Sequence, residues 1–430
     1  MSAALFSSLD GGKSLSQAIS VVLETLHETP SCETDLQIMC FAFTHDRIAD
    51  DLVRLMRARP EIQVRVVADW SQSAASSPTA LQRILALGLP NFQLRYKIDL
   101  PYDWDPKRRR LIYSYARSSG MLHHKTLNLR RNGRSDMLVT GSFNWSNRGE
   151  NAYENILVLD HRAEYDAVRD AFDEEFQALW SDDSLSATPE RARWLFDTLR
   201  KALTEGLDFD DPAALATTLA LPAPALAPGS RAPREWADGP AIAAFSGGYA
   251  LNPRESAGHA ARNDRRKLNL LRAGGARRPA PLTLNTLSME AIRSVPPGAQ
   301  IDIAMYALSN RVPEFQDLIA AAKRGCRVRL LLDRKINAKG IERLQTLVDE
   351  TGLPIELRST GRRMHQKYIA CPEIGMVLTG TANMTMDATM RHADHRILLR
   401  HSPDLAAEFS ADFETIWQRV SQGGNRRLAA

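Results

Sequence analysis

The chain has 430 residues, of which 44% are hydrophobic and 25% are charged. These are ordinary values for globular proteins and exclude a largely disordered chain. No run of apolar residues reaches the ~18 that a spanning helix needs, and the N-terminus lacks the basic and apolar regions of a secretion signal. We therefore expect a cytoplasmic protein without stable membrane insertion, long enough for two domains or one duplicated unit.

The net charge of the chain is modest, but its basic residues are mostly arginines. The net charge is +4, and 45 of the 55 basic residues are arginines. The planar guanidinium of arginine suits bidentate contacts with phosphate. A codon bias in a genome rich in G and C explains the same excess, so a polyanionic partner and a compositional bias both remain open here.

The first predicted elements, residues 37–69, are an apolar strand, an amphipathic helix and a Val-rich strand that ends at Asp69. Basic and aromatic side chains then alternate over residues 102–120, a pattern typical of a groove for single-stranded nucleic acid. A solvated surface is the ordinary alternative. The set comprises Trp104, Lys107, Arg108, Arg109, Arg110, Tyr113, Tyr115 and Arg117.

The next segment, residues 123–160, combines polar groups that a single strand pair can gather. His123 and Lys125 are two positions apart, so on a strand both side chains leave the same face. Asn132-Gly133 predicts a tight type I′ hairpin, which returns the G-S-x-N sequence ending at Asn144 to the neighbourhood of His123. Glu154 follows ten residues later.

A helix with Phe176 and Trp180 closes the first half, and residues 205–240 that follow are rich in Pro, Ala and Gly. Such a composition predicts an extended linker. An arginine cluster comes next, at residues 262–278. We expect three regions: an N-terminal repeat at 1–204, a linker with an Arg-rich insertion at 205–280, and a C-terminal repeat at 281–430.

The second half repeats the first. Residues 300–333 again predict strand, helix and strand ending in Asp, and His365 and Lys367 repeat the H-x-K spacing. A G-T-x-N sequence ends at Asn383, and Asp394 takes the place of Glu154. The closing helix carries its own aromatic pair, Phe413 and Trp417. These parallels predict an α/β fold of two duplicated repeats, each a mixed, mostly parallel sheet flanked by helices.

The paired motifs resemble those of the phospholipase D superfamily, in which two H-x-K sequences, each with a G-[GS]-x-N sequence, form one shared site. The resemblance covers residues 37–180 and 300–420, and it implies one active site at a pseudo-twofold interface. It also implies that His123 attacks phosphorus to form a phosphohistidine and that His365 protonates the leaving oxygen. The family's aspartate five residues after the lysine is absent from both copies, where Arg130 and Pro372 stand.

The resemblance further implies an acid that hydrogen-bonds each histidine ring. We expect two half-sites, His123 with Lys125, Asn144 and Glu154, and His365 with Lys367, Asn383 and Asp394. The shorter acid of the second set makes the first more regular and favours His123 as the nucleophile.

Elementary chemistry agrees with these roles. A neutral imidazole can attack a phosphodiester while the lysines and asparagines stabilise the charge that grows on its oxygens. A histidine pKa near 6.5 permits one neutral and one protonated ring, so neither a metal nor a cofactor is needed.

Three functions remain open at this point. A nuclease acting on DNA or RNA fits the arginines around the motifs, and a phospholipase or phosphatidyl transferase is the alternative. A noncatalytic nucleic-acid-binding relative is the third, and protein partners are not predictable. The residues expected to contact nucleic acid are Arg108, Arg109, Arg110, Tyr113, Tyr115, Arg131, Arg362 and Arg363.

Overall fold

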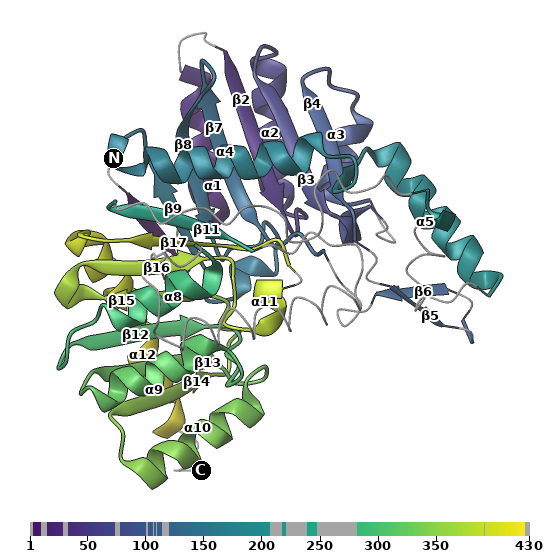
Figure 1. Cartoon of the computed structure of the whole chain (residues 1–430). Helices are drawn as coiled ribbons and strands as arrows, with labels where there is room; N and C mark the ends of the chain where they lie inside the picture. Colours follow the sequence, from purple (N-terminus) through teal and green to yellow (C-terminus); the bar gives the residue numbers. More distant parts are fainter. Residues whose placement is uncertain are drawn as a thin grey trace, which may run out of the picture.

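The computed structural model places the chain in two halves, one above the other in Figure 1. It describes residues 3–9, 15–28, 33–73, 78–99, 102–105, 107–108, 110–113, 120–206, 217–220, 239–246, 282–390 and 392–425.

The N-terminal half contains a mixed sheet, a short hairpin and flanking helices. Its elements are β1 (Ala4–Ser7), α1 (Leu15–Glu28), β2 (Thr34–Cys40), α2 (Asp46–Ala58), β3 (Gln63–Asp69), α3 (Ala80–Ala86), β4 (Phe92–Lys97), β5 (Tyr102–Asp105), β6 (Arg110–Tyr113), β7 (Lys125–Arg131), β8 (Arg134–Gly141), β9 (Asn155–Leu159), α4 (Asp166–Ser181), β10 (Ser186–Ala187) and α5 (Pro189–Thr204).

The C-terminal half repeats this plan. Its elements are β11 (Ala241–Phe245), α8 (Leu284–Arg293), β12 (Gln300–Met305), α9 (Pro313–Lys323), β13 (Arg327–Asp333), α10 (Ala338–Thr351), β14 (Ile355–Thr360), β15 (Lys367–Cys371), β16 (Met376–Gly380), α11 (Met386–Met390), β17 (His395–Leu399) and α12 (Pro403–Asn425).

The strand order is β1-β9-β8-β7-β2-β3-β4-β10 in the first sheet and β11-β17-β16-β15-β12-β13-β14 in the second. Two mixed sheets with flanking helices confirm the predicted duplicated α/β fold. The expectation that each sheet is mostly parallel is wrong. Among the described strands of these two sheets, only β2–β3–β4 and β12–β13–β14 run parallel.

Short connections explain the antiparallel majority. The predicted turn between β7 and β8 has Asn132 at φ 50° and Gly133 at φ 77°, the left-handed values that a type I′ turn requires. The turn joins Arg131 directly to Arg134 in the register of the pair. A two-residue turn can join only antiparallel strands, whereas parallel neighbours need a crossover such as α2 or α9.

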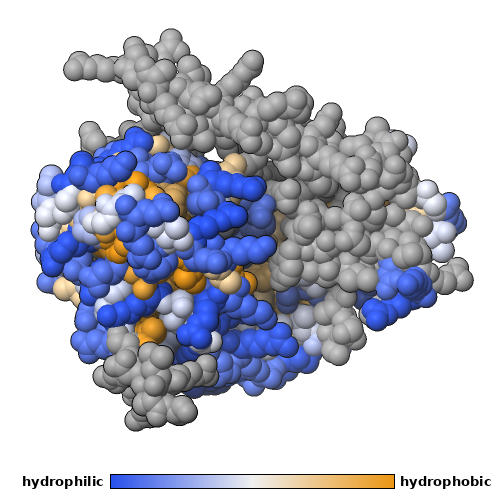
Figure 2. Space-filling model, turned by 90° about the horizontal axis from the view of Figure 1, so that it is seen from below, coloured by the Kyte–Doolittle hydropathy of each residue, from blue (hydrophilic) through white to orange (hydrophobic). Residues whose placement is uncertain are grey.

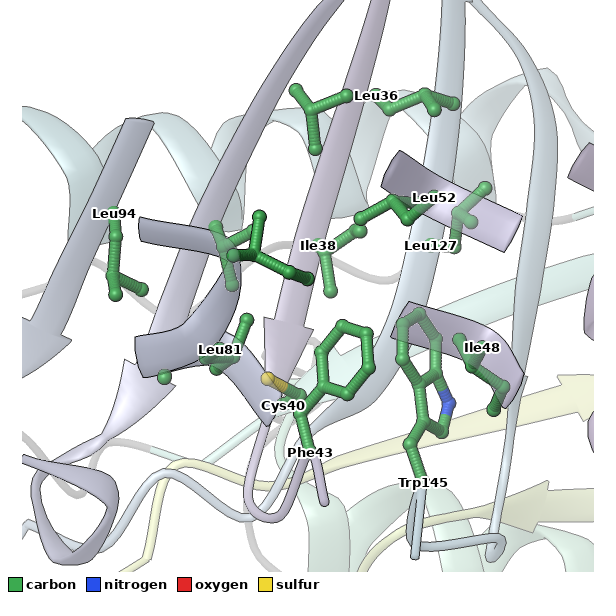
Figure 3. Close-up of a cluster of buried hydrophobic side chains, with 14 of the residues drawn as sticks. Leu36, Ile38, Cys40, Phe43, Ile48, Leu52, Leu81, Leu94, Leu127 and Trp145 are labelled. Carbon is green, nitrogen blue, oxygen red and sulfur yellow. The ribbon is translucent and has the colours of Figure 1, made fainter. Parts of the chain in front are cut away.

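Three clusters of buried apolar side chains hold the layers together. One lies between the first sheet and α1, α2 and α3, and in it the rings of Phe43 and Trp145 pack edge to face, 5.1 Å apart (Figure 3). A second joins the other sheet to α8, α9 and α10. The third contains residues of α4 and α12 together with strands of both sheets, so the two halves share one apolar layer.

The aromatic pairs that close the repeats occupy equivalent places. Phe176 stacks on Trp180 with ring centroids 5.5 Å apart, and Phe413 stacks on Trp417 at 5.3 Å. An arginine guanidinium lies over the phenylalanine ring of each pair: that of Arg65 in β3 is 5.4 Å from the ring centroid in the first half, and that of Arg329 in β13 is 4.9 Å from it in the second. Duplication therefore extends from the motifs to the packing around them.

The range predicted as a linker contains structure of its own. Strand β11, at residues 241–245, pairs with β17 and so belongs to the second sheet. The arginine cluster at 262–278 lies outside the described residues. The domain boundaries thus remain a prediction, with the second repeat starting no later than β11.

Hydrophilic residues cover most of the described surface seen from below, and hydrophobic ones gather on the C-terminal half, at the left of Figure 2. Every helix in the described ranges is too short or too polar to cross a bilayer.

Candidate active site

The two predicted catalytic histidines lie where the backbone of each half pairs with the other. The N–H of His123 donates to the carbonyl of Ala393 at 2.9 Å, and the N–H of Ala393 donates to Met121 at 2.8 Å. The N–H of His365 donates in the same way to Tyr153 at 2.9 Å. The residue before each acid is thus fixed beside the histidine of the opposite half.

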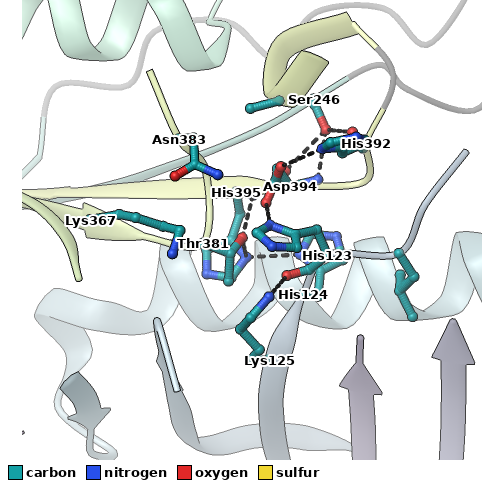
Figure 4. Close-up of polar contacts among 12 residues, drawn as sticks. His123, His124, Lys125, Ser246, Lys367, Thr381, Asn383, His392, Asp394 and His395 are labelled. Atoms are coloured by element: carbon teal, nitrogen blue, oxygen red, sulfur yellow. Dashed lines mark hydrogen bonds and ion pairs between the residues drawn. The ribbon is translucent and has the colours of Figure 1, made fainter. Parts of the chain in front are cut away.

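Each histidine is consequently paired with the acid of the other repeat. Nδ1 of His123 forms a 2.7 Å hydrogen bond with Oδ1 of Asp394 (Figure 4), and Nδ1 of His365 lies 2.8 Å from Oε1 of Glu154. The expected pairing of His123 with Glu154 and of His365 with Asp394 is therefore wrong. The backbone bridges between the halves place the acid of each repeat beside the histidine of the other. The spacing of residues within one repeat cannot predict this exchange.

The two carboxylates differ in electrostatics. Burial favours a raised pKa at Asp394, but His123 outweighs burial, and the pKa of Asp394 lies well below its ordinary value. Burial raises the pKa of Glu154 to about 7 against the opposing effect of Lys367. These directions favour an ionised Asp394 and a partly protonated Glu154 near neutral pH.

Burial favours the neutral form of both imidazoles in the free protein. Burial lowers the pKa of His123 well below its ordinary value, against the opposing effect of Asp394. Burial, Lys367 and Lys125 together lower the pKa of His365 in the same way. Because a lysine of each half affects the histidine of the other, the two half-sites form one electrostatic unit.

The lysines of the two H-x-K sequences are buried cations aimed back at the histidine backbone. Nζ of Lys125 donates to the carbonyl of His123 at 2.5 Å, and Nζ of Lys367 donates to that of His365 at 2.6 Å. Burial lowers the pKa of Lys125 to about 8 and that of Lys367 to about 7, against the carboxylates nearby. When protonated, the two ammonium groups can bind an anion.

Two buried aspartates position the histidines from the ends of the parallel strands. Oδ2 of Asp69, the last residue of β3, accepts the N–H of Leu122 at 2.9 Å. Oδ2 of Asp333, the last residue of β13, accepts the N–H of Met364 at 3.1 Å. Each aspartate thus holds the residue before a histidine, a role that the repeated strand-ending aspartates signal in the sequence.

The motif glycines are required by close approach of the backbone. Gly141 and Gly380 have φ of 146° and 148°. A Cβ on Gly141 would lie 2.3 Å from the carbonyl oxygen of Asn155, and one on Gly380 would lie 2.4 Å from that of His395. These carbonyls follow the two acids directly, so the glycines let the acid-bearing strands approach β8 and β16.

The motif asparagines follow these glycines by three residues. The amide oxygens of Asn144 and Asn383 are buried, and neither has a hydrogen-bond partner among the described residues. The Asn383 side chain is drawn beside the second half-site in Figure 4. These oxygens can accept a hydrogen bond, and the expected donation from the Nδ2 groups to a phosphate stays a prediction.

Two serines that sequence reasoning missed clamp the acids. The N–H of Asp394 donates to Oγ of Ser246 at 2.7 Å, and the N–H of Ser246 donates to the carbonyl of Asp394 at 2.9 Å. Ser8 makes the same two contacts with Glu154, at 3.3 and 3.2 Å. Ser8 directly follows β1 and Ser246 directly follows β11, so a serine just after each edge strand was the available signal.

Among the predicted nucleic-acid contacts, Arg363 lies at the site. It is exposed, its guanidinium lies 5.0 Å from the ring of Tyr306, and that ring contacts the imidazole of His365 at 4.8 Å. Arg362 instead donates to the carbonyls of Asn151 and Ala152 in the other half, each at 3.0 Å.

The other predicted contacts lie elsewhere. Arg131 is at the far end of β7, opposite Thr34, about 20 Å along the strand from Lys125. Arg108 is exposed beside the β5–β6 hairpin, with Asp105 at 3.7 Å. The structure places only the backbone of Arg110 and Tyr113, and Arg109 and Tyr115 lie outside the described residues.

No group of three His, Cys, Asp or Glu side chains in the described part of the chain is arranged to hold a metal ion. The chemistry that the described site offers is that of two imidazole–carboxylate pairs facing two lysines.

Comparison with known proteins identifies the family. A family model described as the PLD-like domain of cardiolipin synthase matches residues 26–180 and 296–417, more than half of the chain. No protein of the curated set matches the sequence.

Solved structures share the fold. Phosphatidylserine synthase from Haemophilus influenzae Rd KW20 is 13% identical, with a TM-score of 0.58 over 96% of this chain and 86% of that one. Polyphosphate kinase from Porphyromonas gingivalis is 11% identical, with a TM-score of 0.50 over 96% of this chain and 50% of that one.

Identities this low show likeness of fold alone, whereas the family model covers both repeats and both H-x-K motifs. Phosphodiester chemistry is what the superfamily has in common. The chain belongs to the phospholipase D superfamily.

Proposed function

We propose that this protein is a metal-independent phosphodiesterase in which His123 is the nucleophile and His365 the general acid. The observation that carries the proposal is the aligned 2.7 Å bond between His123 and Asp394. This bond fixes Nδ1 as the protonated nitrogen, so Nε2 presents its lone pair. As Nε2 attacks phosphorus, positive charge develops on the ring, and the ionised Asp394 stabilises it.

The second pair suits the opposite task. Glu154 has a pKa raised to about 7 by burial, and its carboxylate lies beside Nδ1 of His365. Binding of a phosphodiester anion between the lysines favours protonation of His365, which then gives its Nε2 proton to the leaving oxygen. In the second step, His365 takes a proton from water, and the hydroxide displaces His123 from phosphorus.

The substrate that we propose is nucleic acid. Arg363 and Tyr306 offer a cation and a ring at the mouth of the second half-site, the combination that binds a phosphate and stacks on a base. Arg363 also lowers the pKa of His365, after burial and the two lysines, so its charge reaches the reacting groups. The sequence contains further arginines that could contact phosphates, at residues 108–110 and 262–278.

Phosphatidyl transfer is the second candidate, because the matching family model is described as a domain of cardiolipin synthase. Both substrates present a phosphodiester monoanion, so the histidine chemistry would be the same. The difference lies in what surrounds the phosphate and in whether water or an alcohol attacks the phosphohistidine.

The test compares the wild type with His123→Ala and with His161→Ala, an exposed histidine that serves as the control. Labelled single-stranded DNA, duplex DNA, RNA and phosphatidylglycerol vesicles are incubated with each protein in EDTA. We expect cleavage of a nucleic acid that His123→Ala abolishes and His161→Ala preserves. Cleavage unaffected by His123→Ala would remove the mechanism, and turnover of lipid alone would replace the substrate.

A further inference from the structure

Behind the site, a second pair of histidines joins the two halves. His124 follows His123, and His395 follows Asp394, so each is the chain neighbour of a reacting group. Both side chains are fully buried, and their Nδ1 atoms lie 2.8 Å apart. The rings stack with centroids 5.1 Å apart (Figure 4).

The outer nitrogens of this pair face polar atoms, and that of His395 is hydrogen-bonded, whereas that of His124 makes no aligned hydrogen bond with a described residue. Nε2 of His395 lies 2.7 Å from Oγ1 of Thr140, and Nε2 of His124 lies 3.4 Å from Oε1 of Glu175. Burial, followed by His124, lowers the pKa of His395 well below its ordinary value, which favours a neutral ring.

One arrangement of protons satisfies these three contacts with both rings neutral, and Oγ1 of Thr381, 3.3 Å from Nδ1 of His395, can act as a second acceptor for the same proton. A carboxylate faces Nε2 of His124, so that nitrogen carries the proton and Nδ1 of His124 accepts. Nδ1–H of His395 then donates to His124, and Nε2 of His395 accepts from the hydroxyl of Thr140. The chain of contacts is directional and crosses from one half to the other.

The pseudo-twofold partner of this network lacks imidazoles. The positions of His124 and His395 are taken by Gln366 and Asn155 in the other half. Nε2 of Gln366 donates to Asp412 at 2.7 Å and, at the longer distance of 3.5 Å, to the carbonyl of Glu154 in the other half; Nδ2 of Asn155 donates to Thr379 of the other half at 3.4 Å. In the described residues, no hydrogen bond joins these two amides, and Oε1 of Gln366 has no partner.

The two half-sites differ accordingly. On the side tied by the histidine pair, Nδ1 of His123 and Asp394 form an aligned hydrogen bond. On the other side, Nδ1 of His365 is close to Glu154 at 2.8 Å but makes no aligned hydrogen bond with a described residue. The half-site in which His124 and His395 are bonded is therefore also the one in which the reacting histidine and its acid are better aligned.

We propose that His124 and His395 are positioning residues of the covalent step: their cross-half bond fixes the nucleophile His123 against Asp394, while the amides opposite leave His365 freer to change from acid to base. This inference rests on the proposed function and assigns the rigid half-site to the nucleophile. Loss of alignment should slow the attack on phosphorus without weakening substrate binding.

An activated aryl phosphodiester, such as a p-nitrophenyl ester of a nucleotide, isolates this step. Its leaving group departs without a proton, so the burst of nitrophenolate reports attack by His123 and is independent of His365 as the acid. His123→Ala should abolish the burst, whereas His365→Ala should retain it and accumulate the phosphohistidine. Failure of this pair of results would overturn the proposed function itself.

Thr140 and Thr379 offer a matched pair of variants. Both are buried and occupy equivalent positions, but the first hydroxyl contacts His395 and the second contacts Asn155. We expect Thr140→Val to lower the burst rate constant about tenfold at unchanged KM, as loss of a partner behind a reacting group commonly does. Thr379→Val should change the burst rate constant less than about twofold.

His395→Asn and the double variant His124→Gln/His395→Asn copy the chemistry of the other half into the nucleophile side. Their burst rate constants should fall at least as far as that of Thr140→Val, with thermal unfolding monitored to keep the comparison to folded protein. Equal effects of Thr140→Val and Thr379→Val, or an unchanged burst in folded His395→Asn while His123→Ala is inactive, would overturn the positioning role alone.

Discussion

At the scale of the residue, the two carboxylates determine which histidine acts as nucleophile and which as acid in the proposed mechanism. Asp394 is ionised beside His123, and Glu154 titrates near neutral pH beside His365. With the aryl substrate, we expect Asp394→Asn to lower the burst rate constant on the order of 10²-fold or more, because the imidazolium loses its counter-charge. Glu154→Gln should have a much smaller effect there and a large one with a natural leaving group. The exposed Glu350→Gln is the control, and equal losses from both site variants would contradict the assigned roles.

The lowered lysine pKa values predict an alkaline limit. Lys367 and Lys125 lose their charge as the pH rises through about 7 and about 8, and Glu154 gains charge over the same interval. Every change makes the site more negative, so kcat/KM for a phosphodiester should fall as the pH rises from about 7 to above 8. Lys367→Arg, which stays charged, should move the fall to higher pH. A pH profile identical to that of the wild type would refute this explanation.

At the scale of the element, the glycines that end β8 and β16 should be intolerant of any side chain. Gly141→Ala places a methyl group 2.3 Å from a backbone oxygen, so the strands must separate. We expect the free energy of unfolding to fall by more than about 3 kcal/mol, measured by urea denaturation. Gly133→Ala is the matched control because its Cβ meets nothing within 4 Å; it should cost about 1 kcal/mol from left-handed strain alone. Similar losses would show that strain, not close approach, dominates.

At the scale of the element, strands and turns could be predicted where residues close together in the sequence determine them. Alternation put His123 and Lys125 on one face, and Asn132-Gly133 gave the turn that the structure contains. That same turn implies antiparallel neighbours, so the expectation of a mostly parallel sheet overlooked information in the sequence. Arg130, where the family has an aspartate, donates to the carbonyl of Gly133 at 2.7 Å and supports this turn.

At the scale of the whole molecule, prediction from sequence reached its limit. The crossing of Glu154 and Asp394 arises from backbone bridges between the halves, and the serine clamps come from strands at the edge of each sheet. Neither depends on spacing inside a motif. A duplicated sequence indicates that two sets of residues exist, but the interface decides which members meet.

Two adjacent arginines allow the interface to be separated from substrate binding. Arg362 donates to carbonyls of the opposite half, whereas Arg363 lies exposed near Tyr306. Arg362→Ala should lower Tm because the halves lose these bonds, and it should leave the salt dependence of nucleic-acid binding unchanged. Arg363→Ala should leave Tm unchanged, weaken binding and reduce the slope of log Kd against log salt by about 1.

Arg131→Ala makes the same chemical change far from the site. Its side chain is 31% exposed and its guanidinium lies 3.3 Å from Asp136, at the end of β7 remote from Lys125. We expect neither the salt slope nor the affinity to change in this variant. Binding measured by fluorescence anisotropy from low to moderate salt distinguishes the cases. A loss in Arg131→Ala as large as that in Arg363→Ala would mean that nucleic acid follows the whole length of the first sheet, not the face that carries His365.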